Sequence, residues 1–441
     1  MSRQLPRALA EPGTLSAVVS APSRSSASTI QPLAVSNDVE VNGRRYRWPR
    51  RPCLVVTVDG GDPRYFEDAL ERGLMPALSD MLRGGGAYSV GRGQMPSLTN
   101  PNNMSIVTGA PPSVHGIPGN HYLNPTGAEE QLVDPSALRA PTIHACLARA
   151  GAVVLAVTAK DKLRRLLGAG GVPSVSAERA AEFGLPDLGI ASLPELIGRP
   201  APGVYDWELS CYALEIGLAV HRRCRLDLLY VSLTDFVQHT HAPAEPLADR
   251  FFQRLDQLLG DYLWAGFAVA ITADHGMNPK HNADGTPRVH YLSDVLERSG
   301  IRDFRVILPI TDPYVRHHGA LGSFAWVHVP AEEIERTQEV LAGLPGVEEV
   351  FTRREAAVIY QHPEDRIGDL SVSADARTVL GKQRADHDLS QLTGGLRSHG
   401  GRHEQLVPII VSHPLSEPYS SWHRRGVSNA DVHDLLLNGL A

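Results

Sequence analysis

The sequence predicts an α/β fold in which helices sandwich a mostly parallel central sheet. The chain has 441 residues, of which 42% are apolar, so it can bury a large core. From the segment RPCLVVTVDG onward, short apolar runs of the kind that form strands alternate with segments of helical periodicity. Strands that are apolar throughout and separated by helices are typical of parallel sheets covered on both faces.

Five short apolar runs are predicted to be strands of this sheet. They are Leu54–Val58, Val153–Val157, Leu228–Ser232, Phe267–Thr272 and Val407–Val411. Helices are predicted between them in PRYFEDALERG, MPALSDMLRGG, WELSCYALEIGLAVHRRC and PLADRFFQRLDQLLGDYL. Because such sheets bind ligands beyond the carboxyl ends of their strands, the residues that follow each strand are candidates for a site.

In residues 282–396 the alternation of apolar strands and helices gives way to a mixed pattern, which predicts an inserted α+β cap domain. Helical patterns in HYLSDVLERS and AEEIERTQEVLAGL alternate there with strand-like runs in FRVILPI, SFAWVHVP and VEEVFTR. The predicted core therefore consists of residues 41–281 and 397–441, and LVPIIVS resumes its sheet. Residues 1–40 are rich in Ser, Ala and Pro and lack the apolar stretch of a secretory signal, so we expect a disordered extension.

The composition argues against several classes of partner. A net charge of −7 disfavours a broad surface for nucleic acid or anionic membranes. No apolar run approaches the roughly 20 residues that span a bilayer. The cysteines form no CxxC pair and are expected to be free thiols in a reducing compartment, which favours a cytoplasmic location. They are Cys53, Cys146, Cys211 and Cys224.

Aspartates and histidines recur at the strand ends. They are Asp59 after the first strand, Asp235 and His239 after LLYVS, Asp274 and His275 after FAVAIT, and His399 and His403 before the last strand. A single aspartate there is usually a helix N-cap, but caps do not explain acid–histidine pairs that repeat at one edge. Mixed Asp and His ligation suits zinc, manganese or iron. The number of ligands indicates two ions about 3.5–4 Å apart, an arrangement used in phosphoryl transfer.

The segment MPSLTNPNNMSIVTG places Thr99 where a polar turn enters an apolar helix. A helix N-terminus favours anions, and a threonine hydroxyl becomes a nucleophile when a metal or base lowers its pKa. Taken alone, Thr99 would be an ordinary N-cap residue, but the metal cluster favours the nucleophile. Lys160 and Lys162 in TAKDK follow the strand VVLAV at the same edge. They could hold an anionic group of a substrate or simply begin a solvated helix.

In this order, Asp59, Thr99, DFVQH, TADHGM and SHGG resemble the two-metal pattern of the alkaline phosphatase superfamily. Within it, VNGRRYRWPRRP, MPSLTNPNNMSIVTG, GIPGNHYLN and TAKDKLRRLL are similar to the phosphonoacetate hydrolases. This likeness runs from about Val41 to the C-terminus. It implies an alkaline-phosphatase-like core and zinc-dependent hydrolysis of the C–P bond of phosphonoacetate to acetate and phosphate.

The resemblance also implies a role for each site residue. One Zn²⁺ would be held by Asp59, Asp274, His275 and the Thr99 oxygen, and the other by Asp235, His239 and His399. Thr99 would be the nucleophile and would carry a phospho-threonine intermediate. Asn120 would help to hold the phosphonyl oxygens, while Lys160 and Lys162 would bind the substrate carboxylate. His403 is the alternative to His399, which we prefer because the glycines after it allow close approach to a metal; His241, beside His239, is a further alternative.

Two other functions stay open. A phosphodiesterase or nucleotide pyrophosphatase of the same superfamily would share the ligands and the threonine but would need an aromatic slot, for which GNHY offers His121 and Tyr122. A metal-stabilised binding protein without turnover would be expected to lack the nucleophile. The expected partner is a small anionic phosphonate rather than a nucleic acid or a membrane, and the chain could form a homodimer.

Overall fold

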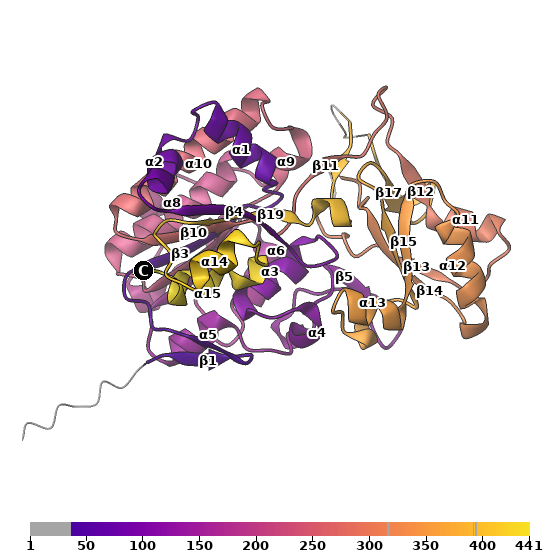
Figure 1. Cartoon of the computed structure of the whole chain (residues 1–441), viewed down its shortest axis with the longest axis horizontal. Coiled ribbons are helices and arrows are strands. Elements are labelled where there is room, and N and C mark those ends of the chain that lie inside the picture. The colour runs from indigo at the N-terminus through magenta and orange to yellow at the C-terminus, as the bar shows by residue number, and fades with distance from the viewer. Residues whose placement is uncertain (1–36, 315–317, 391, 393–394) are drawn as a thin grey trace, which may run out of the picture. The chain divides into compact units, whose positions relative to one another are not determined.

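A seven-stranded sheet lies at the centre of the computed structural model, in the order β4-β19-β10-β3-β9-β7-β8 (Figure 1). Its strands are β3 (Cys53–Thr57), β4 (Ala87–Arg92), β7 (Val154–Thr158), β8 (Ser174–Ser176), β9 (Leu228–Ser232), β10 (Ala268–Thr272) and β19 (Leu406–Val411). β19 pairs antiparallel with β10 and β4, and the other pairs of this sheet are parallel. The predicted α/β fold with a mostly parallel central sheet is confirmed.

All five predicted strands of this sheet are present, with ends shifted by at most one residue. β4 and β8 lie at the two edges of the sheet and were not predicted. β4 has the sequence AYSVGR and is largely half-buried or exposed, so it lacks the continuous apolar run that identified the inner strands. An edge strand of this kind carries little sequence signal.

Helices cover both faces of the sheet (Figure 1). Those on one face are α1 (Pro63–Glu71), α2 (Pro76–Arg83), α8 (Glu208–Arg223) and α10 (Pro246–Trp264); those on the other are α3 (Thr99–Thr108), α5 (Ile143–Arg149), α6 (Asp161–Leu167) and α15 (Val432–Asn438). Leu54 and Val56 of β3 pack with the first set, whereas Cys53 and Val55 pack with the second. Successive side chains of a strand point to opposite faces, so one apolar strand supplies both cores.

A second, antiparallel sheet forms within the segment predicted to be α+β. Its order is β13 (Arg305–Ile307), β14 (Phe324–His328), β16 (Leu370–Ala374) and β15 (Val347–Thr352), and its helices are α11 (Leu292–Arg298), α12 (Ile334–Ala342) and α13 (Arg353–Ile359). Apolar side chains of this segment form a separate core cluster. Residues 37–441 form one compact unit, and the predicted cap boundaries at 282 and 396 stay a prediction.

Shorter elements complete the chain. The remaining strands pair as β1 (Val39–Val41) with β2 (Arg44–Tyr46), β5 (His121–Leu123) with β6 (Glu129–Gln131), β11 (Asn278–Pro279) with β18 (Arg397–Ser398), and β12 (Val289–Tyr291) with β17 (Val379–Gly381). The short helices are α4 (Pro112–His115), α7 (Leu193–Ile197), α9 (Phe236–Thr240) and α14 (Tyr419–Arg424). The β11–β18 pair joins the loop after β10 to the segment that contains His399.

The structure describes residues 37–314, 318–390, 392 and 395–441. The extension predicted for residues 1–40 therefore lies almost entirely outside the described residues. Across the described ranges, no helix combines the length and the apolar character that crossing a bilayer requires.

We expect α3 to depend on the glycine that ends it. Gly109 adopts the left-handed conformation (φ 63°), and a Cβ there would lie 2.1 Å from the Tyr46 hydroxyl oxygen. Gly109→Ala should therefore lower the free energy of unfolding by about 3 kcal/mol, through backbone strain and overpacking together. Chemical denaturation monitored by circular dichroism measures this loss.

Gly127→Ala is the matched control. Gly127 is also left-handed (φ 80°), but a Cβ at this position would have no atom within 4 Å beyond its chain neighbours. The control should lose only about 1 kcal/mol, the cost of strain alone. Equal losses in the two variants would contradict the importance of the contact with Tyr46.

Candidate two-metal active site

The strand directions bring the candidate residues to one edge of the sheet. β3, β9 and β10 are parallel neighbours, so Asp59, Asp235 and Asp274 emerge at the same end. β19 runs in the opposite direction, so its beginning lies at this end too, and His399 precedes it. The central sheet thus gathers residues that are far apart in the sequence, as expected for ligands of parallel sheets.

Asp59, Asp274 and His275 form the first group of potential metal ligands. One ligand atom from each lies within 4.8 Å of the others, and all three side chains are buried. His275 Nε2 lies 3.3 Å from Asp59 Oδ1 and 3.5 Å from Asp274 Oδ2. Two carboxylate oxygens and one imidazole nitrogen thus converge on one point.

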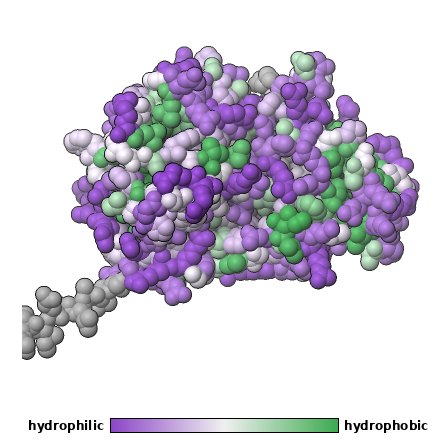
Figure 2. Space-filling view, in the orientation of Figure 1, coloured by the Kyte–Doolittle hydropathy of each residue, from purple (hydrophilic) through white to green (hydrophobic). Residues whose placement is uncertain are grey.

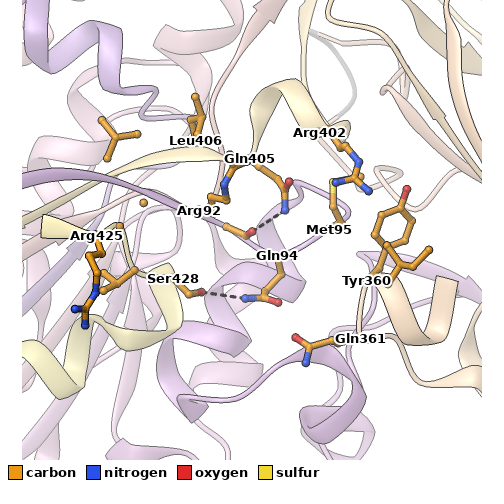
Figure 3. Close-up of a pocket in the computed structure, with 16 residues that line it drawn as sticks. Arg92, Gln94, Met95, Tyr360, Gln361, Arg402, Gln405, Leu406, Arg425 and Ser428 are labelled. Carbon is orange, nitrogen blue, oxygen red and sulfur yellow. Dashed lines mark hydrogen bonds between the residues drawn. The ribbon is translucent and has the colours of Figure 1, made fainter. Parts of the chain in front are cut away.

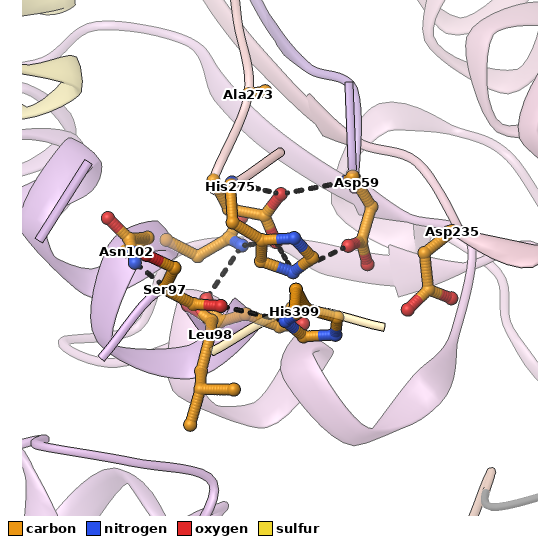
Figure 4. Close-up of polar contacts among 12 residues, drawn as sticks. Asp59, Ser97, Leu98, Asn102, Asp235, Ala273, His275 and His399 are labelled. Atoms are coloured by element: carbon orange, nitrogen blue, oxygen red, sulfur yellow. Dashed lines mark hydrogen bonds and ion pairs between the residues drawn. The ribbon is translucent and has the colours of Figure 1, made fainter. Parts of the chain in front are cut away.

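Asp235, His239 and His399 form the second group, also buried and with ligand atoms within 4.8 Å of one another. His239 lies one turn after Asp235 at the start of α9, and its Nε2 is 3.1 Å from Asp235 Oδ2. The rings of His275 and His399 stack with centroids 3.6 Å apart, which makes the two groups neighbours (Figure 4).

Backbone carbonyls fix the tautomer of all three histidines. The Nδ1 contacts are His239 with the Arg397 carbonyl at 2.8 Å, His275 with the Gly276 carbonyl at 2.9 Å, and His399 with the Ser97 carbonyl at 2.7 Å. A carbonyl oxygen only accepts, so each Nδ1 carries the hydrogen, and a neutral ring keeps its lone pair on Nε2. Burial lowers the pKa of His275 and of His399, which keeps both rings neutral and able to bind a metal.

The buried carboxylates of the first group are poorly compensated. Burial raises the pKa of Asp59 well above its usual range and that of Asp274 to about 7, and the charge of Asp235 adds to both shifts. Within the described part of the chain, Asp59 Oδ1 and His275 Nε2 are buried without a hydrogen-bond partner. Unpaired polar atoms and buried negative charge are costly, and cations would relieve both. The two groups are consistent with a binuclear metal site.

Thr99 is the first residue of α3, and its side chain is buried. Residues close to it in the sequence contact the two ligand groups. The carbonyl of Ser97, two residues earlier, accepts the hydrogen bond from His399. Asn103, one turn after Thr99, donates to the Thr99 carbonyl at 2.9 Å, and its Nδ2 lies 3.5 Å from Asp274 Oδ2. The start of α3 is therefore tied to a member of each group.

Asn120 also lies at the start of α3. Its Oδ1 accepts a hydrogen bond from the backbone N–H of Asn100 at 3.0 Å. Leu98 precedes the helix and makes no side-chain cap, so the Asn120 side chain supplies one of the caps that the helix end needs. Asn120 is buried, and its bond to Asn100 places it one residue from Thr99.

Sequence reasoning missed the support for this helix end. Tyr230 of β9 donates its hydroxyl hydrogen to Asn103 Oδ1 at 2.7 Å, and its hydroxyl oxygen lies 2.8 Å from Thr57 Oγ1. These side chains are fully buried between the sheet and α3. Asn103 stands in the polar segment that drew attention to Thr99, but only the packing identifies Tyr230 as its partner.

Lys160 and Lys162 lie at the end of β7, and both are paired with aspartates. Lys160 Nζ is 2.5 Å from Asp235 Oδ1, next to the second group. Burial opposes the charge of Lys160, but Asp235 and Asp59 outweigh it and raise the pKa of this lysine. Lys162 Nζ forms a buried ion pair with Asp312.

The segment after β13 supplies further residues that the sequence analysis did not identify. The Tyr314 ring lies 4.9 Å from Lys160 Nζ and 5.7 Å from Lys162 Nζ. The His318 ring stacks on His239 with centroids 5.1 Å apart. Asp312 follows the strand-like run FRVILPI, so it shows the same pattern as Asp59, but it lies in the predicted cap, where no site was expected.

The two alternative histidines lie outside both groups. His403 has a 41% exposed side chain and an Nε2 that is 2.9 Å from Glu348 Oε2. His241 Nδ1 lies 2.9 Å from the Thr240 hydroxyl. Of the histidines considered from the sequence, the structure thus brings His239, His275 and His399 together.

Comparison with known proteins identifies the family. The family model described as "Type I phosphodiesterase / nucleotide pyrophosphatase" matches residues 53–403. The phosphonoacetate hydrolase of Sinorhizobium meliloti 1021, crystallised with phosphonoformate and with phosphonoacetate, is 43% identical, with a TM-score of 0.86 over 92% of this chain and 100% of that chain.

A more distant structure shows the same fold. Murine ectonucleotide pyrophosphatase/phosphodiesterase 5 is 18% identical, with a TM-score of 0.61 over 89% of this chain and 96% of that one. The fold expected from the resemblance to alkaline phosphatases is confirmed. The chain therefore belongs to the type I phosphodiesterase/nucleotide pyrophosphatase family of the alkaline phosphatase superfamily and is a homologue of phosphonoacetate hydrolase.

Proposed function

We propose that this protein hydrolyses the C–P bond of phosphonoacetate to acetate and phosphate. The observation that carries the proposal is a pair of buried lysines, of which Lys160 contacts Asp235 of the second ligand group and Lys162 lies near the same Tyr314 ring. A cationic pair at this point matches a carboxylate that lies next to a phosphonate. The 43% identity to an enzyme crystallised with phosphonoacetate supports the same substrate.

We infer that the two ligand groups hold two Zn²⁺ ions. Asp59, Asp274 and His275, with the Thr99 oxygen, would bind one ion, and Asp235, His239 and His399 would bind the other. Neutral imidazoles with free Nε2 lone pairs and buried carboxylates form a donor set that suits zinc. When bound, the ions would lower the pKa of the Thr99 hydroxyl and neutralise charge on the phosphonyl oxygens.

In the reaction we infer, the Thr99 oxygen attacks phosphorus and the C–P bond breaks with its electron pair on the acetate carbon. The carboxylate delocalises this charge, and Lys160 and Lys162 stabilise it as it develops. The carbon then takes a proton from solvent, which gives acetate. Water attacks the phospho-threonine, releasing phosphate and restoring the hydroxyl of Thr99.

Asn120 and the first amides of α3 would hold the phosphonyl oxygens. A helix N-terminus favours an anion, and the Asn120 side chain lies against the Asn100 N–H at this helix end. Asp312 would keep Lys162 in place, since the two side chains form a buried ion pair. The Tyr314 ring, close to both lysines, would orient their ammonium groups toward the carboxylate.

A phosphodiesterase activity is the second candidate, and the name of the matching family model favours it. A nucleotide substrate would need an aromatic surface for its base. Tyr122 is an aromatic residue near Asn120, and the guanidinium of Arg366 lies 5.9 Å from its ring centroid. Because this cation covers one face of the ring, that face is not open to a nucleotide base. We therefore favour phosphonate hydrolysis over phosphodiester hydrolysis.

Thr99→Ala should abolish turnover while leaving metal binding in place. We expect phosphate release from phosphonoacetate to fall by at least about a thousandfold, because the nucleophile is lost. Metal content measured on the same sample should stay close to two ions per chain. Full activity in this variant would exclude Thr99 as the nucleophile.

Thr57→Val is the matched control. Thr57 is a second buried threonine near Asp59, but its hydroxyl is engaged with Tyr230. This variant should keep most of its activity, because valine preserves the shape of the side chain. If Thr57→Val lost activity while Thr99→Ala kept it, Thr99 would not be the nucleophile.

Lys160→Ala and Lys162→Ala together should remove activity on phosphonoacetate selectively. We expect its kcat/KM to fall by at least about a hundredfold, while hydrolysis of bis(p-nitrophenyl) phosphate changes little. Lys382→Ala, which removes a partly exposed lysine paired with Glu129, is the control. Metal content must be measured too, because Lys160 contacts Asp235. Equal loss on both substrates would contradict carboxylate recognition.

Removal of metal should make stability depend on pH. Burial raises the pKa of Asp59 and of Asp274 above the unfolded value, so these two carboxyls bind more protons in the folded metal-free protein than in the unfolded chain. Burial also lowers the pKa of His275 and His399, which acts in the opposite sense until the histidines of the unfolded chain are neutral at about pH 7. Stability should therefore fall as the pH rises from about 7 to about 8, where the two carboxyls decide the slope.

Melting curves over this range, with and without Zn²⁺, measure the effect. With metal bound, the carboxylates are held in their charged form and the decline should disappear. Asp274→Asn should flatten the curve of the metal-free protein. The same decline in the metal-free protein and in the metal-loaded protein would contradict this account.

A further inference from the structure

A cleft of about 560 Å³ lies between the β4–β19 edge of the central sheet and the end of α13, and none of its described lining residues is a candidate metal ligand (Figure 3). This volume is typical of pockets for small organic molecules. Among its described lining residues are three arginines, Arg92, Arg402 and Arg425, and no aspartate or glutamate. The lining is thus strongly positive in a chain whose net charge is −7.

Two of the arginines have uncompensated charge. Arg92 ends β4 and Arg425 follows α14, and both are exposed. Neither forms an ion pair or a side-chain hydrogen bond with another residue in the described ranges. Arg402, in contrast, pairs with Glu349 at 2.6 Å and lies over the Tyr360 ring at 5.6 Å. Guanidinium groups that lack protein partners are well suited to carboxylate or phosphate groups of a ligand.

The side chains are arranged around a common space. Figure 3 shows Arg425 on one side of the cleft and Arg402 with Tyr360 on the other, with Gln94 and Ser428 between them. Gln94 Nε2 donates to Ser428 Oγ at 3.0 Å, and this hydrogen bond joins the two side chains that lie between the arginines. The two guanidinium groups without an ion pair in the described ranges, Arg92 and Arg425, line the same cleft and together match a ligand with more than one negative group.

Apolar side chains form part of the lining. Val90, Ile359 and Leu406 line the cleft and are 37%, 48% and 42% exposed, which is unusual for large aliphatic residues in this chain. Figure 2 shows that hydrophobic patches lie among polar residues on the face of the molecule that it draws. Apolar surface next to unpaired cations favours a ligand with an apolar body rather than a bare inorganic ion.

Gly93, in the lining of the cleft, lies close to the backbone of the loop that carries Asp274. A Cβ on Gly93 would lie 2.8 Å from the Asp274 carbonyl oxygen and 2.8 Å from Asn102 Oδ1. Gln405 Nε2 donates to the Gly93 carbonyl at 3.0 Å. The cleft is therefore a distinct site that abuts the back of the loop carrying Asp274.

We propose that this cleft binds a small organic anion with at least two carboxylate or phosphate groups on an apolar body. Arg92 and Arg425 hold the negative groups, and Val90, Ile359 and Leu406 contact the apolar body. This site lies beyond the proposed function, because none of these residues belongs to the ligand groups, Thr99 or the lysine pair.

Calorimetric titration of the metal-loaded protein tests the proposal. Benzene-1,3,5-tricarboxylate is the carboxylate probe, because its diverging groups do not chelate one metal ion. The probe that represents phosphate groups is 1,3-phenylenebisphosphonate, which carries two groups and has no ester bond to hydrolyse, and benzene-1,3,5-trimethanol is the uncharged control. We expect saturable binding of a charged probe, weakened at least about tenfold in Arg92→Gln/Arg425→Gln. A clear preference for one probe identifies the group that the arginines hold.

Arg223→Gln/Arg298→Gln is the matched control, since it removes two exposed arginines elsewhere and should leave affinity unchanged. Affinity in the wild type should also fall as salt is added. Binding of 1,3-phenylenebisphosphonate at the metal centre would persist in Arg92→Gln/Arg425→Gln, and phosphate release from phosphonoacetate by that variant should match the wild type. Absence of saturable binding, or equal affinity in wild type and Arg92→Gln/Arg425→Gln, would overturn the proposal, whatever the substrate of the metal centre.

Discussion

Three buried aspartates at one sheet edge set the central constraint of this structure. Asp59, Asp235 and Asp274 repel one another where water cannot screen them, which raises the pKa of Asp59 and of Asp274 further than burial alone. The backbone N–H groups of Gly60 and His275 donate to Asp274 Oδ1 at 3.1 and 3.0 Å, and so offset part of the charge. Lys160 pairs with Asp235 and offsets a further part, and bound metal ions would offset the rest. The same repulsion that destabilises the metal-free protein therefore favours metal binding.

A buried ion pair joins the loops that carry the ligands. Lys280 Nζ lies 2.9 Å from Glu404 Oε1, and both side chains are fully buried. Glu404 also accepts from Asn278 at 2.6 Å and, through its other oxygen, from the Gly401 N–H at 3.0 Å. The loop after β10 is thereby tied to the loop before β19. Removing either partner would leave a buried charge unpaired, which is more costly than the pair is stabilising.

The sequence was most informative where a residue's position followed from strand direction. Apolar runs identified the inner strands, and the parallel order then implied that Asp59, Asp235 and Asp274 share an edge. Contacts that depend on packing between distant segments were not accessible in this way. The partner of Lys162 is Asp312 because the segment after β13 reaches the sheet edge, and Tyr230 supports Asn103 because α3 packs over β9. Neither pairing has a local pattern from which it could be derived.

The reversed direction of β19 has a consequence for how the protein is made. His399 reaches the site only through this last strand of the sheet, whereas Asp59, Asp235, Asp274 and His275 precede it in the chain. Since synthesis proceeds from the N-terminus, a nascent chain that ends after β10 and its following loop already contains the whole first ligand group. It lacks one member of the second group until His399 has been synthesised. The order of residues along the chain therefore completes the Asp59 group before the Asp235 group.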